Sequence, residues 1–230
     1  MNAVILAAGD GGRLGTLTRE RPKPLVDIAG RPIISYTLEA LAAAGVREAA
    51  VVVGYRAGQL GEALAADAHG LGLSFIYNPR FREGASLSLA AARQWAGSEP
   101  FLLLMADHLL SEPIIRRLLD ARAETPPGVS LVAADAPERW PADYLDEATR
   151  LALDPDGFVT AIGKHLEPYD ALDTGAFLLD TAAWDALDAA PESCELSAIF
   201  SILAARRALR AVDIGGAHWS DIDTGADLDA

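Results

Sequence analysis

A glycine-rich loop near the start of the chain holds the first residues that could do chemistry. The apolar run Val4–Ala7 leads into Gly9–Gly12, and the cations Arg13 and Lys23 follow. Glycines in such a loop let backbone N–H groups approach phosphate oxygens closely. We therefore expect the loop, Arg13 and Lys23 to form a clamp around a triphosphate.

Two better-known phosphate loops do not fit this segment. The dinucleotide fingerprint needs a glycine at Leu14, and the Walker loop needs a glycine directly before Lys23. The lysine is informative in itself, because only Lys23 and Lys164 among the 19 lysines and arginines are lysine. A compact ammonium and a planar guanidinium are not interchangeable at a phosphate. Both lysines are therefore candidates for phosphate contacts.

Acidic residues at two distant points of the chain could hold a metal. Asp107 directly follows the apolar run Phe101–Met105, and Asp221 and Asp223 lie near the C-terminal end. Mg²⁺ prefers hard oxygen ligands, usually one or two carboxylates with substrate phosphates and water. We expect Asp107 and Asp223 to be the ligands, with Asp221 as the competing choice for the second. No cysteine or histidine cluster surrounds His108, so the sequence favours a local hydrogen-bonding role for it.

The second half of the chain offers groups for another small substrate. Lys164 could neutralise a phosphate, and three acidic residues near predicted strand ends could accept hydrogen bonds from hydroxyl groups: Asp135, Glu147 and Asp173. A different substrate stays open, because three aromatic rings could form a cage around a quaternary ammonium such as that of phosphocholine: Trp140, Tyr144 and Tyr169.

Hydrophobic patterning predicts that strands and helices alternate in the first part of the chain. We expect strands at 4–7, 49–53, 73–77 and 101–105, and helices at 33–44, 59–66, 86–96 and 112–122, with Ser86 as an N-cap. Strands that are apolar throughout and separated by helices are typical of a parallel sheet covered on both faces. Ligands of such sheets bind at the carboxyl ends of the strands, where Asp107 is expected.

After Pro126-Pro127-Gly128 the pattern becomes that of a more mixed or antiparallel region. Strands are predicted at 129–134, 149–153, 158–162, 176–179, 209–214 and 218–222, and helices at 182–187 and 196–207. The prediction is an α/β fold with a Rossmann-like, mostly parallel mixed sheet, helices on both faces and a smaller acceptor-binding region. We expect one domain over 1–230, in which 1–125 bind the nucleotide and 126–230 bind the acceptor and supply the second metal ligand.

Composition argues against several classes of protein. The net charge of −14 disfavours nucleic acid as a partner. Cys194 is the only cysteine, which excludes an intramolecular disulfide and fits a reducing compartment. The start lacks a signal-peptide pattern, and no apolar run approaches the ~20 residues of a membrane helix. We expect a cytoplasmic protein with no membrane contact from this segment. The last residues read as the start of a helix, so we expect that the native polypeptide can continue.

The motifs together resemble a known superfamily. Leu6-Ala7-Ala8-Gly9-x-Gly11-x-Arg13-Leu14 with Pro22-Lys23-Pro24-Leu25 looks like the signature of nucleotidyltransferases that activate sugar phosphates and similar alcohol phosphates. Met105-Ala106-Asp107-His108 resembles their metal-binding segment, with Ala106 in place of the usual glycine. Trp219-Ser220-Asp221-Ile222-Asp223-Thr224 resembles the segment that supplies a second carboxylate.

Two further segments narrow the resemblance. With Ile162-Gly163-Lys164 and Asp173-Thr174-Gly175, the whole of 1–230 resembles CTP:inositol-1-phosphate cytidylyltransferase. In that family the domain stands alone or is fused to a membrane-bound phosphatidyltransferase-like domain. The resemblance implies Mg²⁺-dependent transfer of CMP from CTP to inositol 1-phosphate, with CDP-inositol and pyrophosphate as products. It also places Gly84, Ala85 and Ser86 near the nucleobase, whose selectivity stays open because Glu83 and Ala85 replace residues usual in the family.

The candidate residues can now be collected by role. Catalytic roles are expected for Arg13, Lys23, Asp107 and Lys164. The nucleotide is expected at Leu6, Ala7, Ala8, Gly9, Gly11, Gly12, Arg13, Lys23, Gly84, Ala85 and Ser86. The acceptor is expected at Asp135, Glu147, Lys164, Asp173 and Thr174.

Other functions remain open at this stage. The chain could be a phosphocholine cytidylyltransferase or another sugar-phosphate nucleotidyltransferase. It could also be a non-catalytic, nucleotide-sensing subunit on the same fold, since fold alone does not establish activity. Such a subunit would be expected to have lost Lys23, Asp107 or the glycine loop, and all three are present. A dehydrogenase is disfavoured by the failed dinucleotide fingerprint.

Overall fold

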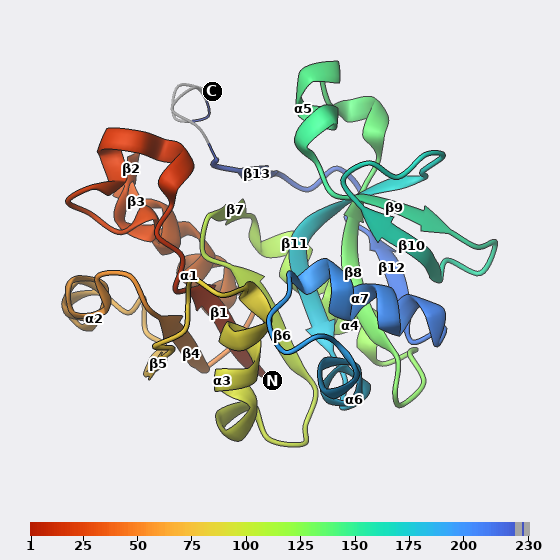
Figure 1. Ribbon diagram of the computed structural model, residues 1–230, viewed down its shortest axis with the longest axis horizontal. Helices are drawn as coiled ribbons and strands as arrows, with labels where there is room; N and C mark the ends of the chain where they lie inside the picture. Colours follow the sequence, from red (N-terminus) through yellow and green to blue (C-terminus); the bar gives the residue numbers. More distant parts are fainter. Residues whose placement is uncertain (224–226, 228–230) are drawn as a thin grey trace.

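A computed structural model describes residues 1–223 and residue 227; for Arg13, Thr16 and Asp143 only the backbone is described. Figure 1 shows a central sheet with helices on both sides. Its parallel part has the strand order β6 (Phe101–Met105), β1 (Asn2–Ala7), β4 (Glu48–Val53) and β5 (Gly72–Tyr77). Leu6 pairs with Met105 in this register. The glycine loop after β1 and Asp107 after β6 therefore leave the sheet at the same edge.

The rest of the sheet is mixed, as predicted. The long strand β11 (Ala171–Leu179) runs antiparallel to β6, to β8 (Ser130–Asp135) and to β9 (Arg150–Leu153). Beyond these, β10 (Val159–Gly163) pairs with β9, and β12 (Leu209–Asp213) runs parallel to β8. Within the described residues these nine strands form one continuous sheet, which confirms the α/β mixed-sheet prediction.

Each face of the sheet carries its own apolar core. On one face lie α1 (Ile33–Ala43), α2 (Ala57–Ala66) and α4 (Glu112–Arg122); on the other lie α3 (Ala85–Ala96), α6 (Ala182–Ala189) and α7 (Leu196–Ala205). Strand side chains alternate between the two cores: Ile5 packs in the first and Val4 in the second. Full burial of such a side chain contributes about 1.5–3 kcal/mol. This two-sided burial is why the central strands β1, β4 and β6 are almost entirely apolar.

Several short elements lie outside the main sheet. A second small sheet pairs β7 (His108–Leu110) with β13 (Trp219–Asp221), and a third pairs β2 (Asp27–Ile28) with β3 (Arg31–Pro32). Single turns of 3₁₀ helix occupy η2 (Lys23–Leu25) and η3 (Pro137–Arg139), a longer 3₁₀ segment forms η1 (Gly12–Thr18), and α5 is Ala142–Glu147. Of these, only β13 was predicted from the sequence. Elements of two to seven residues are too short to show a period.

The N-cap prediction was wrong. The helix α3 begins at Ala85 after Gly84, and the Ser86 hydroxyl caps nothing. It donates instead to the carbonyl of Glu192 and accepts from the N–H of Cys194, so a tertiary contact takes the place of the local cap. The helix start predicted at the end of the chain lies outside the described residues, except at Asp227. Among the helices that are described, each is too short or too polar to cross a lipid bilayer.

Candidate active site

Lys23 is held against the glycine loop by close backbone approach. Gly11 has φ +64°, and a Cβ at Gly11 would lie 2.7 Å from the Cβ of Lys23. The hydroxyl of Thr18 donates to the Gly11 carbonyl over 3.0 Å and closes the loop from the other side. Only 7% of Lys23 is exposed. A glycine at this position therefore lets the loop close over a buried lysine.

The ammonium of Lys23 lies between two carboxylates. Its Nζ donates to Asp107 Oδ2 over 2.8 Å and to Asp223 Oδ1 over 2.7 Å. Burial alone would lower the pKa of Lys23, but Asp107 and Asp223 outweigh it and raise the pKa above its usual value. The lysine predicted to meet phosphates and the two predicted metal ligands therefore form one cluster.

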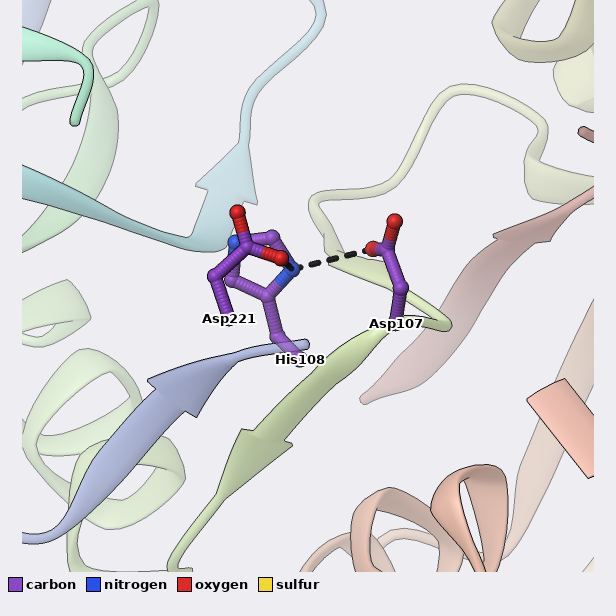
Figure 2. Close-up of side chains that lie close together, drawn as sticks. All are labelled: Asp107, His108 and Asp221. Carbon is purple, nitrogen blue, oxygen red and sulfur yellow. Dashed lines mark hydrogen bonds and ion pairs between the residues drawn. The ribbon is translucent and has the colours of Figure 1, made fainter. Parts of the chain in front are cut away.

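His108 brings a third carboxylate into this group. His108 and Asp221 are paired across β7 and β13, and their side chains meet that of Asp107 (Figure 2). The ring Nδ1 lies 3.0 Å from Asp107 Oδ1 and 3.7 Å from Asp221 Oδ1. Burial lowers the pKa of His108, but the charges of Asp221 and Asp107 raise it to about 9. The ring is therefore protonated near neutral pH and is a hydrogen-bond donor.

The pKa values of the carboxyl groups in this cluster are shifted in different directions. Burial would raise the pKa of Asp107, but the contacts with His108 and Lys23 hold it well below its usual range. Burial raises the pKa of Asp221 to about 6, and the nearby charges of Asp107 and Asp223 act in the same direction. Burial likewise raises the pKa of Asp173 to about 6. A cation that entered the cluster would lower the pKa of Asp221 and Asp173, because a nearby positive charge favours the ionised carboxylate.

Asp107, His108 and Asp221 could hold a divalent metal, since one ligand atom from each lies within 4.8 Å of the others. A histidine must be neutral to bind metal, whereas this ring is protonated between two carboxylates. The carboxylate oxygens are therefore better metal ligands than the ring nitrogens of His108. Asp221 Oδ1 is buried and has no hydrogen-bond partner among the described residues. Such an orphaned hard oxygen fits a hard divalent cation.

Two cavities meet at the cluster. The first has a volume of about 730 Å³ and lies against the glycine loop, Lys23 and α3; the second, of about 410 Å³, lies among α5, β10, β11 and α7. Both are of the size that small-molecule sites have. Asp107 and Asp223 line both cavities, whereas Asp221 lines only the second.

The predicted nucleotide residues are distributed as follows. The first cavity is lined by Leu6, Ala7, Ala8, Gly9, Gly11, Gly12, Lys23, Gly84 and Ala85. Ser86 does not line it, because its hydroxyl is used by Glu192 and Cys194; Ser88, two residues further along α3, lines it instead. The side chain of Arg13 lies outside the described part of the structure.

Three of the five predicted acceptor-binding residues line the second cavity, and two do not. Lys164, Glu147 and Asp173 line the second cavity, and Lys164 Nζ lies 3.8 Å from Glu147 Oε2. Thr174 does not, since it is fully buried and its hydroxyl donates to the Ala133 carbonyl. Asp135 does not either; its buried carboxylate accepts hydrogen bonds from two indole N–H groups.

Sequence reasoning missed several residues of the second cavity. Glu195 lines both cavities, and Ser197 and Thr149 line the second. An acidic residue just before the predicted helix at 196–207 was visible in the sequence, but that position signals a helix start rather than a cavity. Only the tertiary fold brings α7 beside β10 at this cavity.

The aromatic cage considered from the sequence does not form. Trp140 stacks on Tyr144 with ring centroids 4.2 Å apart and leans on Trp219 at 4.9 Å. The ring of Tyr169 lies under the guanidinium of Arg150 at 4.6 Å. Of the three rings predicted for the cage, only that of Tyr144 lines the second cavity.

Comparison with known proteins identifies similar chains. The model of the family described as "MobA-like NTP transferase domain" matches residues 3–209. A Rubrobacter xylanophilus protein named "Bifunctional IPC transferase and DIPP synthase" is 37% identical over 236 residues, covering 99% of this chain and 50% of the relative. A Thermococcus kodakarensis protein of the same name is 33% identical, covering 96% of this chain and 48% of the relative. The chain thus spans about half the length of these relatives.

A solved structure supports the same fold. The structure titled "inositol-1-phosphate CTP transferase from T. maritima" superposes with a TM-score of 0.86 and 23% identity, covering 98% of this chain and 90% of that one. At this identity the likeness shows the fold.

Gly175 should prove essential to the position of His108. Its φ is +75°, and a Cβ at Gly175 would lie 2.6 Å from the imidazole ring. We expect Gly175→Ala to lower the free energy of unfolding by about 2–4 kcal/mol, from the left-handed conformation and the clash together. Urea unfolding measures this loss.

Gly128→Ala is the matched control for Gly175→Ala. Gly128 has φ +84° with nothing within 4 Å of an added Cβ, so it incurs only the conformational cost of about 1–2 kcal/mol. Equal losses in the two variants would contradict a close contact between Gly175 and His108.

Proposed function

This chain belongs to the family of MobA-like NTP transferase domains, and from that premise we propose that it transfers CMP from CTP to inositol 1-phosphate. The observation that carries the proposal is the meeting of two cavities at Asp107 and Asp223. One cavity carries a glycine loop suited to a triphosphate, and the other carries a lysine and carboxylates suited to a polyol phosphate. The names of the relatives and of the solved structure support CTP and inositol phosphate as substrates.

In the proposed reaction, an oxygen of the acceptor phosphate attacks the α-phosphorus of CTP. A new P–O bond forms to the acceptor, and the bond to the bridging oxygen of the departing pyrophosphate breaks. A phosphomonoester is already an anion near neutral pH, so the enzyme needs no strong general base. The main tasks are positioning and neutralisation of charge. The junction of the two cavities, lined by Asp107, Asp223 and Glu195, is where the reacting groups would meet.

We propose Asp107 and Asp223 as the residues that hold Mg²⁺. Both line both cavities, as residues serving the nucleotide and the acceptor together must, whereas Asp221 lines only the second. When bound there, Mg²⁺ would supply Lewis-acid stabilisation of the phosphate charge and a template for the two substrates. Asp221 would then act beside this pair, with its orphaned oxygen turned toward the cluster.

Lys23 would neutralise the phosphates of the nucleotide together with Arg13. An ammonium carries three N–H donors, and the structure describes partners for two of those of Lys23, on Asp107 and Asp223. Because Lys23 also lines the first cavity, the third donor would be available to a phosphate bound there. Lys23 would also keep the two carboxylates close together.

The second cavity would hold the acceptor. Lys164 would neutralise its phosphate, and the carboxylates of Glu147 and Asp173 would accept hydrogen bonds from ring hydroxyls. In this proposal the chain is one domain, in which 1–125 bind the nucleotide and 126–230 bind the acceptor. It corresponds to one half of bifunctional relatives, whose other half would carry the second activity of their name. A cytoplasmic setting is supported by the single cysteine.

Release of pyrophosphate tests the proposed function directly. We expect turnover to be highest with CTP and inositol 1-phosphate when four nucleoside triphosphates are screened against sugar phosphates, inositol 1-phosphate and phosphocholine. Phosphocholine should react poorly, because its methyl groups cannot donate to Glu147 or Asp173. A preference for phosphocholine would overturn the inositol assignment, and no release with any pair would favour a nucleotide-sensing role.

Lys164→Ala separates the two cavities within the same assay. We expect it to raise the KM for the acceptor by about tenfold or more, the usual worth of a charged hydrogen bond. The KM for CTP should stay close to that of the unmodified protein. A change confined to CTP would place Lys164 at the nucleotide instead.

Removal of the metal should abolish activity reversibly. We expect EDTA to stop turnover and excess Mg²⁺ to restore it, and Asp107→Asn to lower kcat at least about 100-fold, since metal-ion stabilisation is worth several kcal/mol. Asp223→Asn should be similarly damaging and Asp221→Asn less so. Circular dichroism should show an intact fold in each variant. A more damaged Asp221→Asn would make Asp221 the second ligand, and near-normal turnover in Asp107→Asn would remove Asp107 from the mechanism.

Replacement of Lys23 should affect kcat more than the KM for CTP. If the ammonium meets charge that develops at the phosphates, Lys23→Ala should lower kcat by about 100-fold. Lys23→Arg should be impaired as well, because a planar guanidinium does not reproduce the position of a compact ammonium between Asp107 and Asp223. Steady-state kinetics with varied CTP measure both effects. A fully active Lys23→Arg enzyme would show that any cation suffices.

A further inference from the structure

We propose that Asp135 is a positioning residue that fixes strand β13, and with it Asp221 and Asp223, against Asp107. It was expected at the acceptor, and the structure gives it a different environment. The proposal rests on the proposed function only in taking these carboxylates as the metal-holding group.

The carboxylate of Asp135 is almost fully buried, with 3% of the residue exposed at the end of β8. Its Oδ2 accepts from Nε1 of Trp140 over 2.8 Å and from Nε1 of Trp219 over 2.9 Å. Its Oδ1 accepts from Arg139 over 3.0 Å and from the N–H of Ala136 over 2.9 Å. Four donors thus converge on a group that only accepts when ionised. An amide here would direct an NH₂ group at other donors.

Trp219 is the point where β13 is attached to the main sheet. β13 belongs to a separate two-stranded sheet with β7, and Trp219, its first residue, is 3% exposed. The hydrogen bond of its indole to Asp135 links it to the end of β8. Residues two apart on a strand point to the same side, so the orientation of Trp219 constrains that of Asp221.

The register of β13 decides whether the site can form. Asp221 pairs with His108, and the N–H of Ile222 donates to the Asp107 carbonyl over 3.0 Å. A slip of one residue would turn the side chain of Asp221 to the opposite face. β13 spans only three residues, so its ladder with β7 is short. A buried indole bound to a buried charge supplies a fixed reference point at the start of the strand.

The test compares three variants of the chain by hydrogen exchange of peptides that cover 217–223 and 106–111. Asp135→Asn disrupts the hydrogen-bond acceptor of the Trp219 indole. Trp219→Phe removes the indole N–H donor while keeping an aromatic ring. Asp180→Asn is the matched control. Asp180 is 5% exposed, binds Arg122 and the N–H of Thr181, and lies at the opposite end of the β8–β11 pair, where its own N–H donates to Ser130.

We expect faster exchange in both peptides in Asp135→Asn and Trp219→Phe, and unchanged exchange there in Asp180→Asn. Combining the first two changes should add little, since they break the same hydrogen bond. Mn²⁺ binding, followed by electron paramagnetic resonance, should weaken about 10- to 100-fold in these two variants, as loss of support behind metal ligands does.

Unchanged exchange in Trp219→Phe, or the same pattern in Asp180→Asn, would overturn the proposal. A failure of the proposed function would be detected by a different measurement, the release of pyrophosphate. A protein that releases no pyrophosphate with CTP and any acceptor would refute the cytidylyltransferase assignment, whereas the exchange comparison would still decide the role of Asp135.

Discussion

The buried ammonium of Lys23 between Asp107 and Asp223 is the interaction on which the site depends. Asp107 lies 84 positions and Asp223 200 positions after Lys23 in the sequence. The three residues follow β1, β6 and β13, with Lys23 after β1, Asp107 after β6 and Asp223 after β13. Like charges at this distance would separate the carboxylates, and leaving one member of a buried pair unmatched costs about 3–5 kcal/mol. Three nearby features support this contact: the close approach of Gly11 to Lys23, the 3₁₀ turn of η2 and the attachment of β13.

Much of the fold was predictable because its causes are local. Strands buried on both faces are apolar at every position, and helices between them carry readable ends, so β1, β4, β6 and α4 could be placed to within two residues. β11 shows the limit. Only its apolar end at 176–179 was predicted, because Asp173, Thr174 and Gly175 interrupt the pattern, and the structure has a register irregularity after Asp173.

The candidate site was predictable as a set of residues but not as a geometry. Types and order point to Lys23, Asp107 and Asp223, yet nothing in the sequence says that a lysine would bind both carboxylates. Ser86, Asp135 and Thr174 show the converse. Each is polar and lies near a predicted strand or helix end, but each is buried, with its hydrogen bonds made to protein groups. Burial is decided by tertiary packing, so a polar residue in a sequence cannot be assigned to a ligand or to the interior from its type alone.

The charge balance of the cluster bears on how an acidic protein can bind phosphates. Among the described side chains, Asp107, Asp173, Asp221 and Asp223 converge with Lys23 and His108, so acidic groups outnumber cationic ones. A triphosphate brought alone to this junction would meet net repulsion, strengthened by burial. A nucleotide that arrives with a divalent cation reverses the sign. The same excess of carboxylates that repels a bare phosphate therefore favours a metal–nucleotide complex. The positive charges of Lys23 and His108 reduce the repulsion among these carboxylates in the folded chain.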